Sequence, residues 1–220
     1  ARDAKRRGFH TLAVTDHSPA AGIANGLEPK RLKKHIAAIR RADEKIKGIS
    51  ILAGTEVDIL ADGRLDYDDE LLAELDLVVA SPHVALGQNP DKATARLLKA
   101  IENPYVHIIG HPTGRLIGRR EGMHPKMAKL FDAAAETHTA LEINASDWRL
   151  DLSDVHARAA LEAGVQLSIN TDAHGAEDFD QLPYGVMTAR RAWAEAKDVV
   201  NCLTPAKFRK WLKKKRSALT

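Results

Sequence analysis

Short apolar segments alternate with longer segments of helical periodicity along the chain. Six of the apolar segments are rich in Val, Ile, Leu and Ala, and we expect them to be buried strands: 12–15, 51–55, 77–81, 108–110, 141–143 and 167–171. A seventh strand is expected at 198–203. Regular alternation of short strands and helices is typical of a parallel sheet, so the pattern predicts an α/β fold.

Segments with apolar residues near a helical spacing lie between these strands, and proline and cap residues mark several of their ends. We expect helices at 29–47, 68–75, 89–101, 125–136, 153–163, 186–196 and 204–218. Residues 1–9 have the pattern of the end of a helix, with Gly8 as its cap. We therefore expect the chain to begin inside its first βα unit, after one strand.

A residue that can bind a metal or orient a substrate follows each of the six strands. These residues are Asp16-His17, Glu56, His83, His111, Asn144 and Asp172-Ala173-His174. A barrel of parallel strands places all the carboxyl ends on one face, so the side chains are expected to converge. Imidazole and carboxylate groups bind Zn, Mn and Fe. The sequence therefore predicts a barrel with a multinuclear metal site, whose expected ligands are His17, Glu56, His83, His111, Asp172 and His174.

The alternative for any single histidine is a core residue with satisfied hydrogen bonds, which is the more common case. The joint pattern favours ligands, because burying six such groups without partners would cost several kcal/mol each. His107 lies four positions before His111, so it is expected near the opposite end of the barrel in a structural role. The remaining histidines are expected at the surface: His10, His35, His124, His138 and His156.

Three arginines follow His111 on one predicted loop. Arg115, Arg119 and Arg120 are candidate substrate-binding residues, because guanidinium groups bind phosphate through forked hydrogen bonds. The alternative for Arg119 and Arg120 is a solvated charged loop. Arg115 and Asn144 are the candidate catalytic residues beside the metals, and Glu142 shares the strand face of Asn144.

The net charge of +3 hides an asymmetry along the chain. Seven of the 33 basic residues lie within 207–216, and without them 26 basic residues stand against 30 acidic ones. Phe208, Trp211 and Leu212 form an apolar stripe that is expected to pack on the barrel. The basic side chains expected to face outward and bind nucleic acid are Lys210, Lys213, Lys214 and Arg216. The alternative is a solvated last helix.

The composition narrows the class of protein. The 220 residues suit one domain over 1–220, with 44% hydrophobic and 29% charged residues. Cys202 is the single cysteine, which excludes an internal disulfide and a cysteine zinc site and is consistent with a reducing cytoplasm. No segment has the length of a membrane helix or the pattern of a signal peptide.

Several of these segments resemble the motifs of the PHP (polymerase and histidinol phosphatase) superfamily, in the same order. The motifs are Thr15-Asp16-His17-Ser18, Gly54-Thr55-Glu56, Ser81-Pro82-His83, Gly110-His111-Pro112-Thr113-Gly114-Arg115 and Asn170-Thr171-Asp172-Ala173-His174. Leu141-Glu142-Ile143-Asn144-Ala145 and Tyr184-Gly185-Val186 most resemble the C-terminal PHP domain of bacterial and archaeal family X DNA polymerases.

The resemblance implies a distorted (β/α)7 TIM-like barrel that holds up to three Zn, Mn or Fe ions. Glu56 would bridge two metals, one of them completed by His83 and His111. Asp172 would serve a second site, and His17 with His174 a third. The family's first strand carries His-x-His, and this chain lacks that segment. The barrel is therefore expected without its first strand, with fewer metals.

The implied activity is metal-dependent phosphoester hydrolysis, as a 3′-5′ exonuclease and 3′-end processing domain in DNA repair. The implied partners are DNA 3′ ends and an upstream polymerase domain of the same parent chain, with a cytoplasmic, nucleoid-associated location. Two alternatives stay open. One is a free-standing PHP phosphatase for a small monoester such as histidinol phosphate, and the other is a non-catalytic structural PHP module.

Overall fold

Six parallel strands form one sheet in the order β1-β2-β3-β4-β5-β6. The computed structural model describes residues 1–216, apart from the side chain of Ile23. The strands are β1 (Thr11–His17), β2 (Ser50–Asp58), β3 (Leu77–Ser81), β4 (Ile108–Ile109), β5 (Ala140–Asn144) and β6 (Leu167–Asn170). Within residues 1–216 the edge strands β1 and β6 do not pair, so the sheet is a curled half-barrel. The expected α/β architecture is confirmed.

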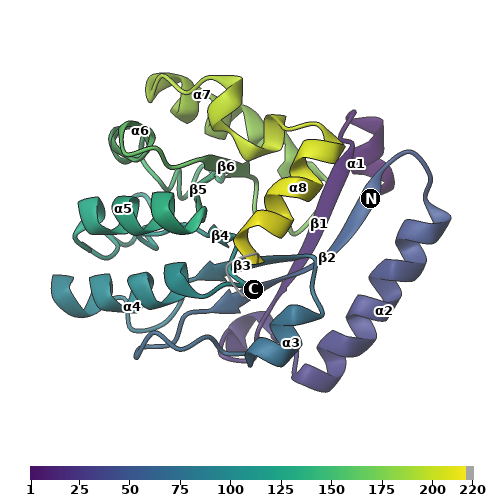
Figure 1. Cartoon of the computed structure of the whole chain (residues 1–220), viewed down its shortest axis with the longest axis horizontal. Helices are drawn as coiled ribbons and strands as arrows, with labels where there is room; N and C mark the ends of the chain where they lie inside the picture. The colour runs from purple at the N-terminus through teal and green to yellow at the C-terminus, as the bar shows by residue number, and fades with distance from the viewer. Residues whose placement is uncertain (217–220) are drawn as a thin grey trace.

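Helices follow the strands and surround the sheet. They are α1 (Arg2–Arg6), α2 (Pro29–Lys45), α3 (Asp69–Ala73), α4 (Pro90–Glu102), α5 (Met127–Thr137), α6 (Asp154–Glu162), α7 (Leu182–Arg191) and α8 (Pro205–Arg216). Figure 1 shows α2 to α7 around the outside of the strands and α8 across the centre of the view. Among residues 1–216, no helix combines the length and apolar character needed to cross a bilayer.

Polar side chains cap three of these helices, and Asn89 is the cap expected from the sequence. The side chains of Asp68, Asn89 and Ser153 accept hydrogen bonds from backbone N–H groups in the first turns of α3, α4 and α6. Helix α7 starts earlier than the expected 186–196, because Pro183 occupies its first turn, and it ends at Arg191, before Trp193 with φ +62°.

The prediction of a seventh strand at 198–203 is wrong. This segment forms two short 3₁₀ turns, η3 (Ala196–Asp198) and η4 (Val200–Cys202), and only Val199 makes a parallel bridge to Leu167. The Asn201 side chain explains the difference. Its Oδ1 accepts from the Ile169 N–H at 2.8 Å, and its Nδ2 donates to the Ile169 carbonyl oxygen at 2.9 Å. A side chain thus satisfies the β6 edge in place of a strand.

The inner face of the sheet changes from apolar to polar along each strand. On β2, Leu52 packs in an apolar cluster near the amino end, whereas Glu56 lies near the carboxyl end. On β5, Ala140 belongs to the same cluster, and Glu142 and Asn144 follow at alternate positions. On these two strands the side chains of the metal-binding type therefore lie toward the carboxyl edge.

Helix α8 fills the apolar part of this inner face. Trp211 and Leu212 are buried with Leu77, Val79 and Ile108, and Phe208 packs against the cluster. The predicted apolar stripe on the terminal helix is confirmed. The last residues of the predicted helix 204–218, 217 and 218, lie outside the described part of the chain.

Two basic side chains at the end of α8 anchor it to other helices. Buried Lys215 donates from Nζ to the Ile101 carbonyl oxygen and to Thr139 Oγ1, both at 2.7 Å. Arg216 donates to the Leu75 carbonyl oxygen at 2.7 Å. These carbonyls lie at the ends of α3 and α4, where backbone acceptors lack helical partners and attract cations. The expectation that Arg216 faces outward is therefore wrong.

His107 is buried where the strands meet α8. Its Nδ1 accepts from the Val78 N–H, its Nε2 donates to the Leu212 carbonyl oxygen, and its ring centroid is 6.1 Å from that of Trp211. Burial, with the nearby Arg216 cation, lowers the pKa of His107 to about 3. The predicted structural role is confirmed.

This buried neutral histidine predicts a loss of stability in acid. The unfolded chain binds a proton at His107 near pH 6.5, whereas the folded chain binds it only near pH 3, so stability falls as pH decreases between these values. Between pH 7 and 5 we expect a loss of about 2 kcal/mol in the free energy of unfolding from this group. Urea unfolding at both pH values should show a smaller loss for His107→Asn than for the wild type. An exposed control, His124→Asn, should keep the wild-type loss.

Candidate metal centre

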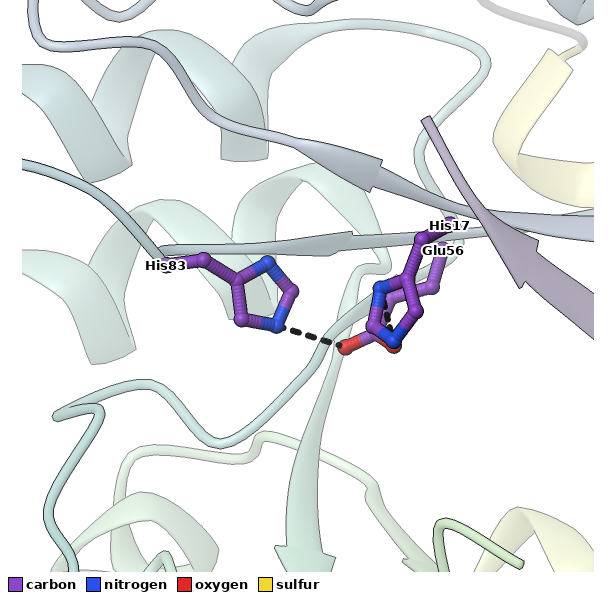
Figure 2. A group of neighbouring side chains, drawn as sticks. All are labelled: His17, Glu56 and His83. Carbon is purple, nitrogen blue, oxygen red and sulfur yellow. Dashed lines mark ion pairs between the residues drawn. The ribbon is translucent and has the colours of Figure 1, made fainter. Parts of the chain in front are cut away.

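Three histidine side chains from the carboxyl edge of the sheet converge on the Glu56 carboxylate. Strand register sets His17 of β1 directly opposite Glu56 of β2. His17 Nδ1 lies 3.3 Å from Glu56 Oε2, and His83 Nε2 lies 3.5 Å from Oε1 (Figure 2). His111 Nε2 lies 3.0 Å from the same Oε1.

The imidazole rings also contact one another. The ring centroid of His83 is 5.1 Å from that of His17 and 4.9 Å from that of His111. Glu56 and His111 are buried, whereas His17 and His83 are partly exposed. The cluster therefore lies at the base of a site that is open on one side.

Gly110 lets His111 approach this cluster. A Cβ at position 110 would lie 2.3 Å from Ser81 Oγ and 2.8 Å from Val79 Cγ1, so a larger residue would force β3 and β4 apart. His111 itself has φ +25°, a conformation that costs energy and is common in functional sites.

A buried carboxylate orients His83. Asp58, fully buried on β2, accepts from His83 Nδ1 at 3.0 Å and from Ser18 Oγ at 3.2 Å. This leaves His83 Nε2 turned toward Glu56, the arrangement that metal-binding histidines use. Burial opposes protonation of His83, but Asp58 and Glu56 outweigh it and raise its pKa to about 9. Although burial favours the neutral acid, the hydrogen bonds of His111 and His83 hold the Glu56 pKa well below its usual range.

The donor set and its spacing fit a divalent cation. Ligand atoms of His17, Glu56 and His83 all lie within 4.8 Å of one another. Ligands bound at roughly 2.0–2.2 Å to one ion lie about 3.0–3.5 Å apart. The distances from the histidine nitrogens to the Glu56 oxygens are in this range. His17 Nδ1 is buried and makes no hydrogen bond, although Glu56 Oε2 lies 3.3 Å away, so a cation between the two atoms would satisfy both. Three imidazoles and a carboxylate suit Zn, Mn or Fe.

Asp172 and His174 lie further along the same edge. Asp172 has φ +53° and accepts from Asn144 Nδ2 at 3.2 Å. His174 donates from Nδ1 to the Asp172 carbonyl oxygen, which leaves its Nε2 free, and its side chain is 71% exposed. Its ring centroid is 6.2 Å from that of His17. These two residues are thus beside the Glu56 cluster and do not contact Glu56.

The three predicted arginines have different surroundings. Arg115 donates from Nε to the Arg149 carbonyl oxygen at 2.8 Å and from Nη2 to that of Leu150. Arg120 donates to the Gly114 carbonyl oxygen at 2.6 Å from Nη2 and at 3.0 Å from Nε. The exposed Arg119 lies over the Trp148 ring.

Sequence reasoning missed three residues at this edge: Asp58, Arg149 and Asp151. Asp58 lies two positions after Glu56, so strand alternation places both on one face and was a usable signal. Arg149 Nε lies 3.7 Å from Asp172 Oδ2, and its buried Nη1 has no hydrogen-bond partner. Asp151 Oδ2 accepts from the Thr113 and Gly114 N–H groups. Arg149 and Asp151 lie on an aperiodic loop, which gave no signal.

Glu142 fixes the backbone of His111 through a hydrogen bond. Its Oε2 accepts from the His111 N–H at 2.7 Å, and its Oε1 accepts from Asn170 Nδ2 at 2.8 Å. Burial raises the Glu142 pKa to about 7, although the nearby charge of His111 lowers it.

His35, predicted as a surface residue, is partly buried and pairs with Asp16 at 2.8 Å.

No family model matches the chain. The chain is 46% identical over 196 residues to DNA polymerase/3′-5′ exonuclease PolX of Bacillus subtilis, a match that spans 89% of this chain and 34% of that protein. It is also 30% identical to a probable phosphatase of Thermoanaerobacter sp. strain X514, over 98% of this chain and 87% of that protein. The chain therefore spans about a third of the polymerase and most of the phosphatase.

A solved structure has the same fold. Histidinol phosphate phosphatase of Lactococcus lactis, crystallised with zinc, L-histidinol and phosphate, matches with a TM-score of 0.57 over 88% of this chain and 86% of that chain. Sequence identity is 15%, so this likeness concerns the fold. With relatives at 30% identity or more along most of their length, the chain belongs to the PHP superfamily of phosphoesterases.

Proposed function

We propose that this chain is a metal-dependent phosphoesterase that hydrolyses the 3′ ends of DNA, as part of a family X polymerase. The observation that carries the proposal is the convergence of three histidines on the Glu56 carboxylate at the carboxyl edge of the sheet. An ordinary apolar core does not gather three imidazoles and a carboxylate, because burying such polar groups costs free energy.

Each ligand-type residue has a proposed part. His17, Glu56, His83 and His111 would hold metal at the cluster, and Asp172 and His174 would hold a further ion beside it. Bound there, a divalent cation supplies a low-pKa water as nucleophile and neutralises charge at phosphorus. Asp58 fixes the orientation of His83, and Glu142 fixes the backbone of His111.

Arginine and asparagine side chains would position the substrate. Arg149 has an unused buried Nη1 next to Asp172, which makes it a phosphate-binding candidate beside Arg119 and Arg120. Arg115 uses its guanidinium on the backbone of residues 149 and 150, so we propose that it acts by fixing that loop. Asn144 would hold the Asp172 carboxylate in place.

The DNA substrate is proposed from the polymerase relative and from charge. That relative, of which the match spans 34%, is named as a DNA polymerase and 3′-5′ exonuclease. Helix α8 adds a basic surface, since Lys210, Lys213 and Lys214 are exposed. In the parent chain an upstream polymerase domain would share this substrate.

A second candidate is a phosphatase for small phosphate monoesters. The observation in its favour is the match to probable phosphatases, which covers 87% of one of them. The substrate would then be a small molecule without a nucleobase, and the basic surface of α8 would have no role in binding it.

Hydrolysis assays on the metal-free chain after addition of Zn, Mn or Fe separate these functions. We expect stepwise shortening of a single-stranded oligonucleotide from its 3′ end. Release of phosphate from p-nitrophenyl phosphate without shortening of the oligonucleotide would favour the second candidate. Tight metal binding with neither reaction would indicate a structural module and contradict both proposals.

The basic surface of α8 gives a separate prediction. Replacing exposed Lys210 and Lys213 by Ala should weaken single-stranded DNA binding and reduce the salt slope by about 0.7 per lost phosphate contact. The free energy of unfolding of this double variant should stay unchanged.

Lys215→Ala should instead lower the free energy of unfolding by about 1–3 kcal/mol, because it leaves buried acceptors without a donor. Filter binding at several salt concentrations and urea unfolding measure the two effects. An unchanged salt slope in the Lys210→Ala, Lys213→Ala variant would show that these basic side chains are solvated and do not contact DNA.

A further inference from the structure

Trp148 is a half-exposed ring on the loop that follows β5. Its side chain is 50% exposed, and the Arg119 guanidinium carbon lies 4.1 Å from the ring centroid. The Ile117 N–H donates to the Trp148 carbonyl oxygen at 2.7 Å, which joins the loops after β4 and β5. Ile117 is itself 45% exposed. We call the surface made by Ile117, Arg119 and Trp148 the Trp148 platform.

The platform lies at the edge of the sheet that carries the candidate metal ligands. One of its loops begins after His111 and the other after Asn144, which are residues of the site. Arg149, next to Trp148, pairs with Asp172, and Arg115 holds the backbone of Arg149. The loop that presents Trp148 is therefore fixed to the site at two points.

The surroundings of the platform are positively charged. Arg119 and Arg120 make no ion pair with an acidic side chain within residues 1–216, and an open cavity of about 410 Å³ is lined by residues 115–121. Burial, and the nearby charge of Arg149, lower the Arg120 pKa. Arg119 lies over the Trp148 ring, and Arg120 donates to the Gly114 carbonyl oxygen, so neither positive charge is neutralised by a carboxylate. An aromatic ring beside such guanidinium groups complements a ligand that has both planar rings and phosphates.

A second exposed tryptophan, Trp193, forms a similar pair with an arginine away from the site. Trp193 is 75% exposed, and the Arg158 guanidinium carbon lies 4.5 Å from its ring centroid. It follows α7, which runs back from the carboxyl edge of β6, so it lies toward the opposite edge of the sheet. The Trp148 pair differs in its place beside the ligand cluster, and Trp193 is a matched control.

We propose that the Trp148 platform stacks on a base near the 3′ end of single-stranded DNA, while Arg119 and Arg149 contact the adjacent phosphates. The proposal rests on the proposed function and names the part of the substrate that the site holds. Base stacking on an aromatic ring tolerates any sequence, as a 3′-end nuclease requires. A small phosphate monoester has no base to occupy the platform.

Binding measured without metal tests this directly. The full chain in EDTA is titrated into a fluorescein-labelled single-stranded oligodeoxynucleotide of about ten nucleotides, and into the same strand with abasic 3′-terminal positions. Trp148→Ala should weaken binding of the intact strand by about 5–100-fold and change binding of the abasic strand much less. Trp193→Ala should leave both affinities unchanged. Trp148→Phe, which keeps a ring, should retain binding if Trp148→Ala fails to fold.

Three results would overturn the proposal: no binding of the intact strand by the wild type, equal weakening of the intact and abasic strands by Trp148→Ala, or tighter binding of the matched RNA strand. Hydrolysis of p-nitrophenyl phosphate by the metal-loaded wild type is measured in parallel. Hydrolysis with no difference between the intact and abasic strands would contradict the stacking role of the Trp148 platform alone. Tighter binding of the intact strand with no hydrolysis would contradict the proposed function alone.

Discussion

Replacing Glu56 by Gln is expected to abolish metal binding and phosphoester hydrolysis together. The carboxylate is the one group that His17, His83 and His111 all approach, at 3.0–3.5 Å. Gln keeps the volume but removes the negative charge, so three imidazoles would surround a neutral amide. Loss of a supporting residue alone costs about 10–100-fold in metal affinity or activity, and we expect loss of this ligand to cost more than 100-fold.

Metal content after dialysis and the rate of p-nitrophenyl phosphate hydrolysis measure these effects. His111→Ala should likewise lose both, because it removes a second group from the cluster. His124→Ala is the matched control, since the His124 side chain is exposed and lies 3.9 Å from Glu121, away from the cluster. Full metal content in Glu56→Gln would mean that the ion binds elsewhere and would remove the basis of the proposed function.

Replacing Trp211 by Ala is expected to lower the free energy of unfolding by about 3–5 kcal/mol. The ring is 8% exposed, stacks on Phe208 with centroids 5.5 Å apart, and fills the inner face of the sheet beside Leu77 and Val79. Its removal would leave a cavity between α8 and the strands.

Urea unfolding at neutral pH measures the loss, and two variants identify its cause. Trp211→Phe should cost less than about 1.5 kcal/mol, because it keeps a ring and deletes an Nε1–H that is buried without a partner. Trp193→Ala removes an exposed ring and should stay within about 0.5 kcal/mol. Equal stability of the wild type and Trp211→Ala would show that α8 does not pack on the sheet.

The parallel α/β fold was predictable because local signals agree with it. The apolar runs at 51–55 and 77–81 lie within or match the observed strands β2 and β3, and Asn89 caps α4 as expected. Strand direction then fixes which end of each run carries His17, Glu56 and His83. For these residues, sequence order and the geometry of parallel strands were enough to predict that they converge.

Contacts between segments far apart in the chain decided the rest. The run at 198–203 has the apolar composition of a strand, yet Asn201 satisfies the β6 edge with its side chain. Arg216 belongs to a basic run, yet it donates to a carbonyl at the end of α3, more than a hundred residues earlier. Neither partner can be read from local composition.

The sequence by itself thus determined the parallel α/β class, the position of most strands and the gathering of imidazoles and a carboxylate at one edge, because each depends on periodicity and chain direction. Only the tertiary structure decided that Asp58 orients His83, that Arg115 holds the loop of Arg149, and that Trp148 lies beside this edge. These features depend on which loop reaches which side chain, and loop conformation is set by hydrogen bonds between distant residues, for which composition carries no periodic signal.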